Sequence, residues 1–105
     1  AVIKPDLIIH SHHGRRIVAD TKYKVGTTPK PGDLYQMLTY CRVLQLTHGV
    51  LVTVGSGDPK RYEVFDGTTT IEVIPVDLSG NLSSVDKSIR SLATRLLELL
   101  EVVRP

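Results

Sequence analysis

The periodicity of apolar residues constrains the fold of this chain more than any other feature. Two stretches repeat apolar residues every three or four positions, and they predict helices over about 33–49 and from about residue 83 onward. Five shorter segments are β-branched or alternate apolar with polar residues, which is typical of strands. These segments are residues 2–9, 16–23, 50–54, 61–65 and 70–76. The order strand, strand, helix, strand, strand, strand, helix indicates an α/β or α+β fold with a mixed β-sheet flanked by helices.

Turn and capping residues set the expected limits of these elements. The polar segment 11–15 separates the first two strands and predicts that they form an antiparallel hairpin. Asp33 is the expected N-cap of the first helix, and Gly49 supplies its stop. Ser83 followed by Asp86 resembles a capping box, which predicts the start of the last helix.

The apolar faces of the two helices predict how each packs against the sheet. In the first helix the stripe consists of Leu34, Met37, Leu38, Cys41, Val43 and Leu44. In the last helix it consists of Val85, Ile89, Leu92, Ala93, Leu96, Leu100 and Val103. Cys41 lies on such a stripe, so we expect a buried, small hydrophobic side chain there rather than a nucleophile.

Length and composition exclude several classes of protein. The 105 residues suffice for one compact domain, and the formal net charge of +2 is too small for a dedicated nucleic-acid coat. Any phosphate-binding surface must therefore be local. The single cysteine excludes an internal disulfide and fits a reducing cytoplasm, which is the expected location. No apolar run approaches the length of about 20 residues that spans a bilayer.

Three charged residues stand where strand alternation expects apolar ones. Asp20 and Lys22 are two positions apart in a strand, so their side chains leave the same face. If the hairpin pairs as predicted, Asp6 comes beside Asp20. Two adjacent carboxylates repel each other unless a cation lies between them, and Mg²⁺ favours carboxylates, waters and a substrate phosphate as ligands. A lysine beside such a site can orient a water or offset charge on a phosphate.

Gln36 and Tyr40 provide a second group of candidate residues. They are four positions apart in the first predicted helix and share a face to one side of its apolar stripe. An amide and a phenol at this spacing could contact a phosphate, a water on the metal, or the ammonium group of Lys22.

The order of these residues resembles a known superfamily. Pro5-Asp6 followed by Asp20-Thr21-Lys22 is similar to the signature of PD-(D/E)xK nucleases, and Gln36-Met37-Leu38-Thr39-Tyr40 is similar to the QxxxY motif of their RecB-like branch. The longer segments 4–9, 19–24 and 33–40 resemble the C-terminal nuclease domain of McrC. That family is the nuclease subunit of the McrBC restriction systems, which act on DNA containing 5-methylcytosine.

The resemblance implies a restriction-endonuclease-like core and a role for each matching residue. Asp6 and Asp20 would be metal ligands, together with the backbone carbonyl of Thr21, and Lys22 would be the catalytic lysine. Gln36 and Tyr40 would support the substrate or that lysine. The implied reaction is Mg²⁺-dependent hydrolysis of a DNA phosphodiester, with Mn²⁺ able to substitute, leaving a 5′-phosphate and a 3′-hydroxyl.

The resemblance also implies partners. These are DNA and an AAA+ GTPase subunit similar to McrB, and cleavage of both strands needs two active sites, so a homodimer or larger assembly is expected. Lys24 and Lys30 are candidates for contacts to the DNA backbone. No membrane partner is expected.

One departure concerns the start of the chain. Cores of this superfamily place a helix and a strand before the strand that carries the first aspartate, whereas this chain has only residues 1–4 before Pro5 and begins without Met. We therefore expect residues 1–105 to be a single nuclease domain and a C-terminal fragment of a longer protein, with that helix and strand missing.

Three alternatives stay open at this level. The chain could be a RecB-like exonuclease of DNA repair or of a mobile element, or a non-catalytic DNA-binding or assembly domain of the same fold. It could also be an unrelated small α/β binding module, which a wide separation of Asp6 and Asp20 would favour.

Overall fold

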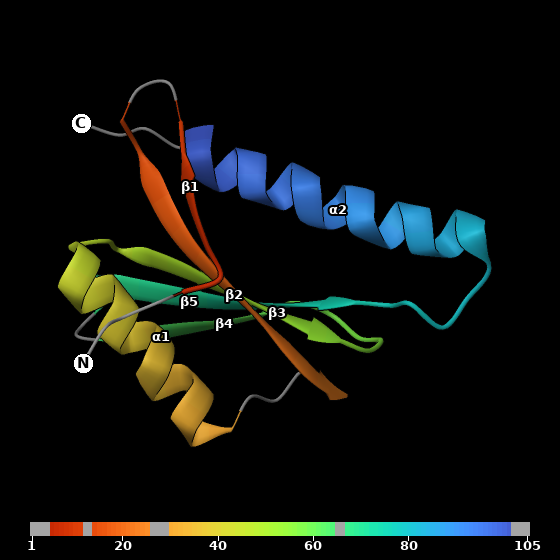
Figure 1. Cartoon of the computed structure of the whole chain (residues 1–105), viewed down its shortest axis with the longest axis horizontal. Helices are drawn as coiled ribbons and strands as arrows, with labels where there is room; N and C mark the ends of the chain where they lie inside the picture. Colours follow the sequence, from red (N-terminus) through yellow and green to blue (C-terminus); the bar gives the residue numbers. More distant parts are fainter. Residues whose placement is uncertain (1–4, 12–13, 26–29, 65–66, 102–105) are drawn as a thin grey trace.

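The computed structural model describes residues 5–11, 14–25, 30–64 and 67–101, and for residues 23–25 it describes the backbone alone. These residues form five strands and two helices, which follow one another in the predicted order: β1 (Leu7–His10), β2 (Arg16–Val25), α1 (Pro31–Leu44), β3 (His48–Val54), β4 (Lys60–Val64), β5 (Thr69–Val76) and α2 (Leu82–Glu101). Helix α1 covers one face of the sheet and α2 the other (Figure 1). The prediction of an α/β fold with a mixed sheet flanked by helices is confirmed, and the fold is compatible with a restriction-endonuclease-like core.

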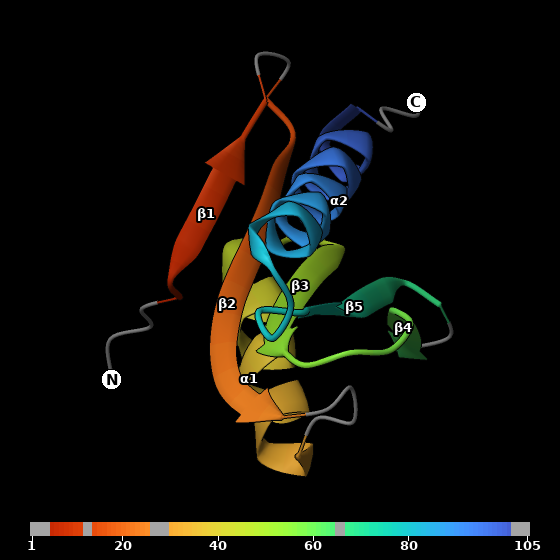
Figure 2. The same cartoon turned by 90° about the vertical axis from the view of Figure 1, so that its right-hand side faces the viewer.

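The sheet has the strand order β1-β2-β3-β5-β4. β1 pairs with β2 antiparallel, so the predicted hairpin is confirmed, with Leu7 opposite Ala19 and His10 opposite Arg16. β2, β3 and β5 run parallel, and β4 returns antiparallel to β5. The hairpin extends beyond the rest of the sheet, beside the C-terminal end of α2 (Figure 2). There the Arg15 Nε donates a hydrogen bond of 2.8 Å to the carbonyl of Leu99.

Alternate residues of the strands fill two separate hydrophobic clusters. The cluster beneath α1 contains Val18, Met37, Tyr40, Cys41, Leu51, Ile71 and Val73. The cluster beneath α2 contains Ile17, Ala19, Val50, Ile74, Leu99 and Leu100. Because both faces of β3 are covered, its continuous apolar run needs no polar face. In β2, Val18 belongs to the cluster beneath α1, so strand alternation places Asp20 and Lys22 on that same face.

The limits of α1 differ from the sequence prediction at both ends. Pro31 is its first residue, and Asp33 lies in the first turn, where its carboxylate accepts a hydrogen bond of 3.3 Å from the backbone N–H of Lys30. Proline suits the first helical position because its fixed φ is helical and the N–H that it lacks has no partner there. The helix ends at Leu44, and Gln45 caps it with a φ of 58°.

Gly49 is not the helix stop that the sequence predicted. It is a buried residue of β3, and a Cβ placed on it would lie 2.5 Å from Sδ of Met37. The absent side chain therefore lets α1 pack closely against the sheet. On the same helix, the prediction that Val43 joins the apolar stripe is wrong, because Val43 is 58% exposed.

The start of α2 is also set differently from the prediction. Asn81 precedes the helix, and its Oδ1 accepts a hydrogen bond of 2.9 Å from the backbone N–H of Ser84. Asn81 is thus the capping residue, and the expected box of Ser83 and Asp86 does not form. Farther along α2, Leu99 is buried, although the predicted apolar face of this helix does not include it. Within the described parts of the chain, neither helix combines the length and apolarity needed to cross a membrane.

Candidate active site

The structure brings Asp6 and Asp20 together at the start of β1. The backbone N–H of Asp6 donates a hydrogen bond of 3.0 Å to Oδ1 of Asp20. In return, Oδ2 of Asp6 accepts hydrogen bonds from the N–H and the Oγ1 of Thr21, at 2.8 and 2.7 Å. Asp6 is exposed, whereas Asp20 is only 5% exposed. The hairpin therefore presents one buried and one accessible carboxylate side by side.

Lys22 joins this pair to helix α1. Its Nζ lies 3.0 Å from Oδ2 of Asp20 and donates a hydrogen bond of 2.6 Å to Oε1 of Gln36. The three side chains meet because Asp20 and Lys22 leave the same face of β2, the face that α1 covers. Two fixed acceptors thus hold the ammonium group at the edge of the buried carboxylate.

Charges and hydrogen bonds within the site shift two pKa values in the direction that keeps the groups ionised. The hydroxyl of Thr21, followed by its backbone N–H, lowers the pKa of Asp6 below its usual value. Burial alone would lower the pKa of Lys22, but the hydrogen bond and the negative charge of Asp20 outweigh it and raise the pKa. Both shifts favour the charged forms of Asp6 and Lys22.

Tyr40 lies deeper than the sequence predicted. Its side chain belongs to the cluster beneath α1 and is 6% exposed, rather than lying to one side of the apolar stripe. Burial raises the pKa of its phenol, and the negative charge of Asp20 adds to this. Tyr40 thus forms part of the wall of the site, while Gln36 is exposed at its rim.

The donor set fits a hard divalent cation that retains waters. Among the described residues no group of three or more His, Cys, Asp or Glu side chains could hold a metal. Mg²⁺, however, is commonly held by one or two carboxylates with waters and a substrate phosphate completing its octahedron. Each carboxylate oxygen has two lone pairs, so Asp6 and Asp20 keep acceptor capacity beside the hydrogen bonds that they make. A cation at Asp20 would compete with Lys22 for Oδ2.

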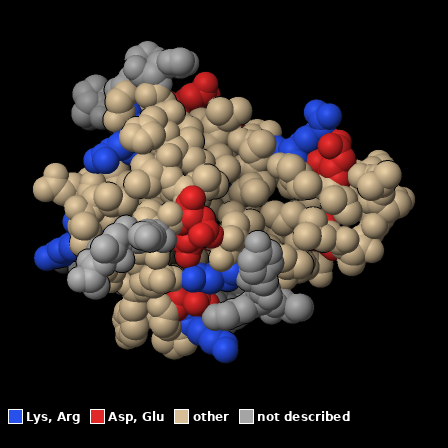
Figure 3. Space-filling view, viewed as in Figure 1, with Lys and Arg blue, Asp and Glu red and all other residues tan. Residues whose placement is uncertain are grey.

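The two candidate DNA-contacting lysines lie near the start of α1. Lys30 immediately precedes the helix and is exposed, and the side chain of Lys24 lies outside the described residues. In the space-filling view, acidic and basic side chains alternate down the centre of the face that carries β1 and α1 (Figure 3). Contacts of Lys24 and Lys30 with DNA stay predictions, and so does the ligand role of the Thr21 carbonyl.

Two threonines contribute to the site in ways that the sequence does not predict. The sequence predicts a role for the carbonyl of Thr21, whereas the structure shows its hydroxyl and N–H holding Asp6. Thr53 pairs with Lys22 in the parallel register of β2 and β3, so the two side chains share the face beneath α1. The Thr53 hydroxyl is buried without a hydrogen-bond partner among the described residues. The sequence signal for Thr53 is that it is the one polar residue in the otherwise apolar run Val50-Leu51-Val52-Thr53-Val54.

Comparison with known proteins identifies the family. A family model described as McrBC 5-methylcytosine restriction system component matches residues 1–53. This match covers just over half of the 105 residues, so the chain belongs to the family of McrBC restriction system components. Asp6, Asp20, Lys22, Gln36 and Tyr40 all lie within the matched segment. A search of curated proteins found no match.

Proposed function

We propose that this chain is the nuclease part of a McrBC-like restriction system, a metal-dependent DNA endonuclease of the PD-(D/E)xK type. The observation that carries the proposal is the meeting of Asp6, Asp20, Lys22 and Gln36 at one end of the hairpin, within the segment that matches the family. Two carboxylates, a lysine and an amide at these distances are suited to phosphodiester hydrolysis.

In the proposed mechanism Asp6 and Asp20 would hold Mg²⁺ or Mn²⁺. The bound ion would supply Lewis acidity toward the scissile phosphate and would lower the pKa of a water. Lys22, steered by Gln36, orients the attacking water and offsets negative charge on the phosphate. The oxygen of that water forms a bond to phosphorus and the bond to the 3′ oxygen breaks, which leaves a 5′-phosphate and a 3′-hydroxyl that takes up a proton.

Partners follow from the same proposal. A McrB-like AAA+ GTPase subunit would recognise modified DNA and drive translocation, and two copies of the nuclease site would cut the two strands. A net charge of only +2 supports this sharing of tasks between subunits. Binding to DNA needs many positive charges, so other parts of the assembly would supply much of the DNA-binding surface.

Cleavage of circular DNA tests the proposal. We expect the chain to nick or linearise a supercoiled plasmid in Mg²⁺ but not in EDTA, and Asp20→Asn to abolish cleavage while its circular dichroism spectrum stays native. Asp58→Asn, which removes an exposed carboxylate in the turn before β4, is the matched control and should cleave normally.

Each other outcome selects an alternative. Digestion of linear DNA with circular DNA untouched would indicate a RecB-like exonuclease. Cleavage that survives in a pure Asp20→Asn sample would contradict the assignment of the site. Absence of cleavage together with absence of binding to millimolar Mg²⁺ or Mn²⁺ in calorimetry would favour a non-catalytic assembly domain.

A further inference from the structure

A groove of about 570 Å³ lies between α2 and the strands β4 and β5. It lies on the face of the sheet opposite Asp20 and Lys22, because its floor residues Glu72 and Ile74 point toward α2. None of the residues that line it belongs to the candidate active site, and the proposed function assigns no role to it.

The α2 wall of the groove is a stripe of hydroxyl and cationic side chains. Its polar lining residues recur at helical spacing and are Ser84, Lys87, Ser88, Ser91 and Arg95. The hydroxyl of Ser84 donates to the carbonyl of Asn81 at 3.0 Å, and that of Ser88 accepts from the N–H of Asp77 at 2.9 Å. The stripe contains no carboxylate. Small serine side chains also let a ligand approach the helix closely. The opposite wall contributes Lys60 and Arg61 from β4.

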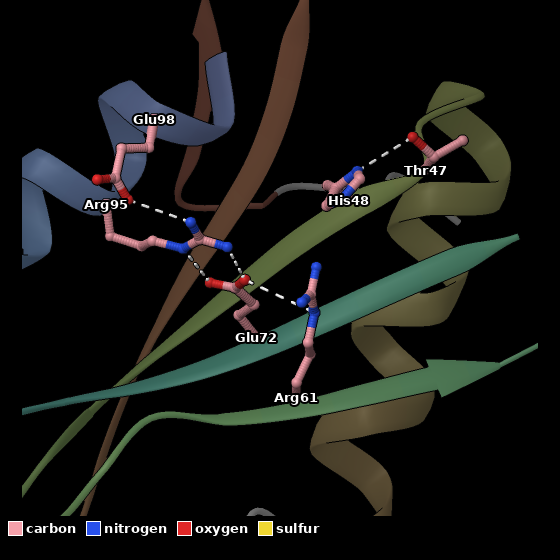
Figure 4. Close-up of polar contacts among 6 residues, drawn as sticks. All are labelled: Thr47, His48, Arg61, Glu72, Arg95 and Glu98. Carbon is pink, nitrogen blue, oxygen red and sulfur yellow. Dashed lines mark hydrogen bonds and ion pairs between the residues drawn. The ribbon is translucent and has the colours of Figure 1, made fainter. Parts of the chain in front are cut away.

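The one carboxylate of the groove is already neutralised. Glu72 on β5 accepts two hydrogen bonds from Arg95, one of them from Nε at 2.9 Å, and Arg95 Nη1 also donates to Glu98 at 3.1 Å (Figure 4). Arg95 and Glu72 are therefore committed to each other, and together they anchor α2 to the sheet.

Three cations of the groove remain available for a ligand. Lys60 on β4 is exposed and makes no ion pair among the residues that the structure describes. Nε of Arg61 lies 4.0 Å from Glu72, and the side chain of Arg61 is 55% exposed. Lys87 is exposed and makes no ion pair within the described parts of the chain. With Lys60, Arg61, Lys87 and Arg95 against Glu72, the groove has a formal charge of +3, whereas the whole chain has +2. The positive charge is thus concentrated here.

We propose that this groove binds the phosphate backbone of a nucleic acid, as a second contact distinct from the candidate active site. A phosphodiester chain offers hydrogen-bond acceptors and continuous negative charge, which matches three uncommitted cations and the hydroxyl of Ser91. Arginine, lysine and serine are the side chains that commonly contact DNA phosphates. The contact deepens the proposed function and rests on it for the identity of the nucleic acid as DNA.

Salt-dependent binding of a short, labelled DNA duplex in EDTA tests the groove without cleavage. Each phosphate contact adds a slope of about −0.9 to log K against log salt. We expect Lys87→Gln to reduce the slope by about one, and Arg61→Gln with Lys87→Gln to reduce it by about two. Arg90→Gln is the matched control, because Arg90 lies on the same helix, pairs with Asp86 outside the groove and carries the same charge.

The outcomes separate this proposal from the proposed function. Equal slopes for the wild type and Lys87→Gln, or equal losses in Lys87→Gln and Arg90→Gln, would overturn the groove while leaving cleavage of the plasmid intact. Binding of polyglutamate in place of DNA, lost in Lys87→Gln, would overturn it in favour of an acidic protein partner. A chain that binds DNA through Lys87 but never cleaves would retain the groove and refute the nuclease.

Discussion

Asp6 depends on a residue of another strand for its position. It precedes β1, so no strand ladder fixes it, and its carboxylate is held instead by the N–H and hydroxyl of Thr21. Because Thr21 lies between Asp20 and Lys22 in β2, one segment of strand positions both carboxylates and the lysine. An exposed carboxylate is thereby kept beside a buried one, which is the arrangement that the proposed metal site needs.

Thr53 gives a prediction at the residue scale. A buried hydroxyl without a partner costs about 1–3 kcal/mol, so Thr53→Val should leave the free energy of unfolding unchanged or raise it. The same substitution should slow Mg²⁺-dependent cleavage, because it removes a polar group beside Lys22 in the sheet register. Urea denaturation and plasmid cleavage measure the two effects.

Thr53→Ser is the control for this prediction, since it keeps the hydroxyl and loses one methyl group. It should cleave like the wild type. Full activity in Thr53→Val would show that the hydroxyl takes no part in the site, and a marked loss of stability would show that it has a partner in the folded protein.

The residues of the site were predictable to the extent that local periodicity places them. Alternation in one strand predicts that Asp20 and Lys22 share a face, and they do. The contacts of Thr21 with Asp6 and the neighbourhood of Thr53 and Lys22 depend on the pairing register between strands, and a single sequence does not specify that register. Lys22 and Gln36 meet because of how α1 crosses the sheet, which is also set by tertiary packing.

At the scale of elements, Gly49 controls how closely α1 approaches β3. Met37 is fully buried, so its side chain has little room to move away from an added methyl group. We expect Gly49→Ala to destabilise the fold by about 1–3 kcal/mol, as overpacking of a core commonly does. Thermal unfolding followed by circular dichroism measures this.

A second glycine offers the matched control for that prediction. Gly32 lies in the first turn of α1, and a Cβ placed there meets nothing within 4 Å. Gly32→Ala should therefore be neutral or slightly stabilising, because alanine has the higher helix propensity. A loss as large as that of Gly49→Ala would contradict the packing argument.

Element order was predictable from the sequence, whereas element limits were less so. Strand alternation and helical periodicity extend over several residues, and they gave every element in the correct order. Single capping residues are ambiguous, because Asp33 can serve in a first turn as well as at an N-cap. Gly49 similarly suits a helix stop or a close contact between helix and sheet, and only the packed structure distinguishes the two uses.

The pair of Glu72 and Arg95 makes the docking of α2 dependent on pH. Hydrogen bonds from Arg95 lower the pKa of Glu72 below its ordinary value of 4.5. The carboxylate is thus favoured in the folded protein, so its contribution to stability is complete above the ordinary pKa. That contribution is lost as the pH falls through the lower folded-state pKa.

Glu72→Gln should therefore lower the free energy of unfolding at pH 7 by about 1–2 kcal/mol, a value kept modest because Arg95 is partly exposed. The difference from the wild type should shrink as the pH falls below about 4.5. Burial and Arg15 lower the pKa of His48 whereas Glu72 raises it, so the comparison is made in a His48→Gln background, where this histidine adds nothing to the difference. A difference that stays constant from pH 7 to pH 3 would show that the charge of Glu72 is not the cause.

At the scale of the whole molecule, the two faces of the sheet carry different chemistry. The face beneath α1 holds the carboxylates, Lys22 and Gln36, and the face beneath α2 holds the ion pair of Glu72 and Arg95 with the cationic groove. The strands between them are largely apolar on both faces, so the two polar groups do not share side chains. A substitution in the groove should therefore leave Asp6 and Asp20 undisturbed, which allows each site to be tested alone.

Divalent cations should stabilise the whole fold if the two carboxylates form their site. A ligand that binds only the folded chain raises its free energy of unfolding by about 2.7 kcal/mol at a concentration one hundred times Kd. Mg²⁺ would also offset the repulsion between Asp6 and Asp20, although it must compete with Lys22 for Oδ2 of Asp20. We therefore expect the melting temperature of the wild type to rise with Mg²⁺ or Mn²⁺ and to return to its starting value in EDTA. Asp6→Asn and Asp20→Asn should abolish this rise, whereas Asp58→Asn should keep it. An equal rise in Asp20→Asn would mean that the cation binds elsewhere on the chain, and the carboxylate pair would then lose its role as the metal site.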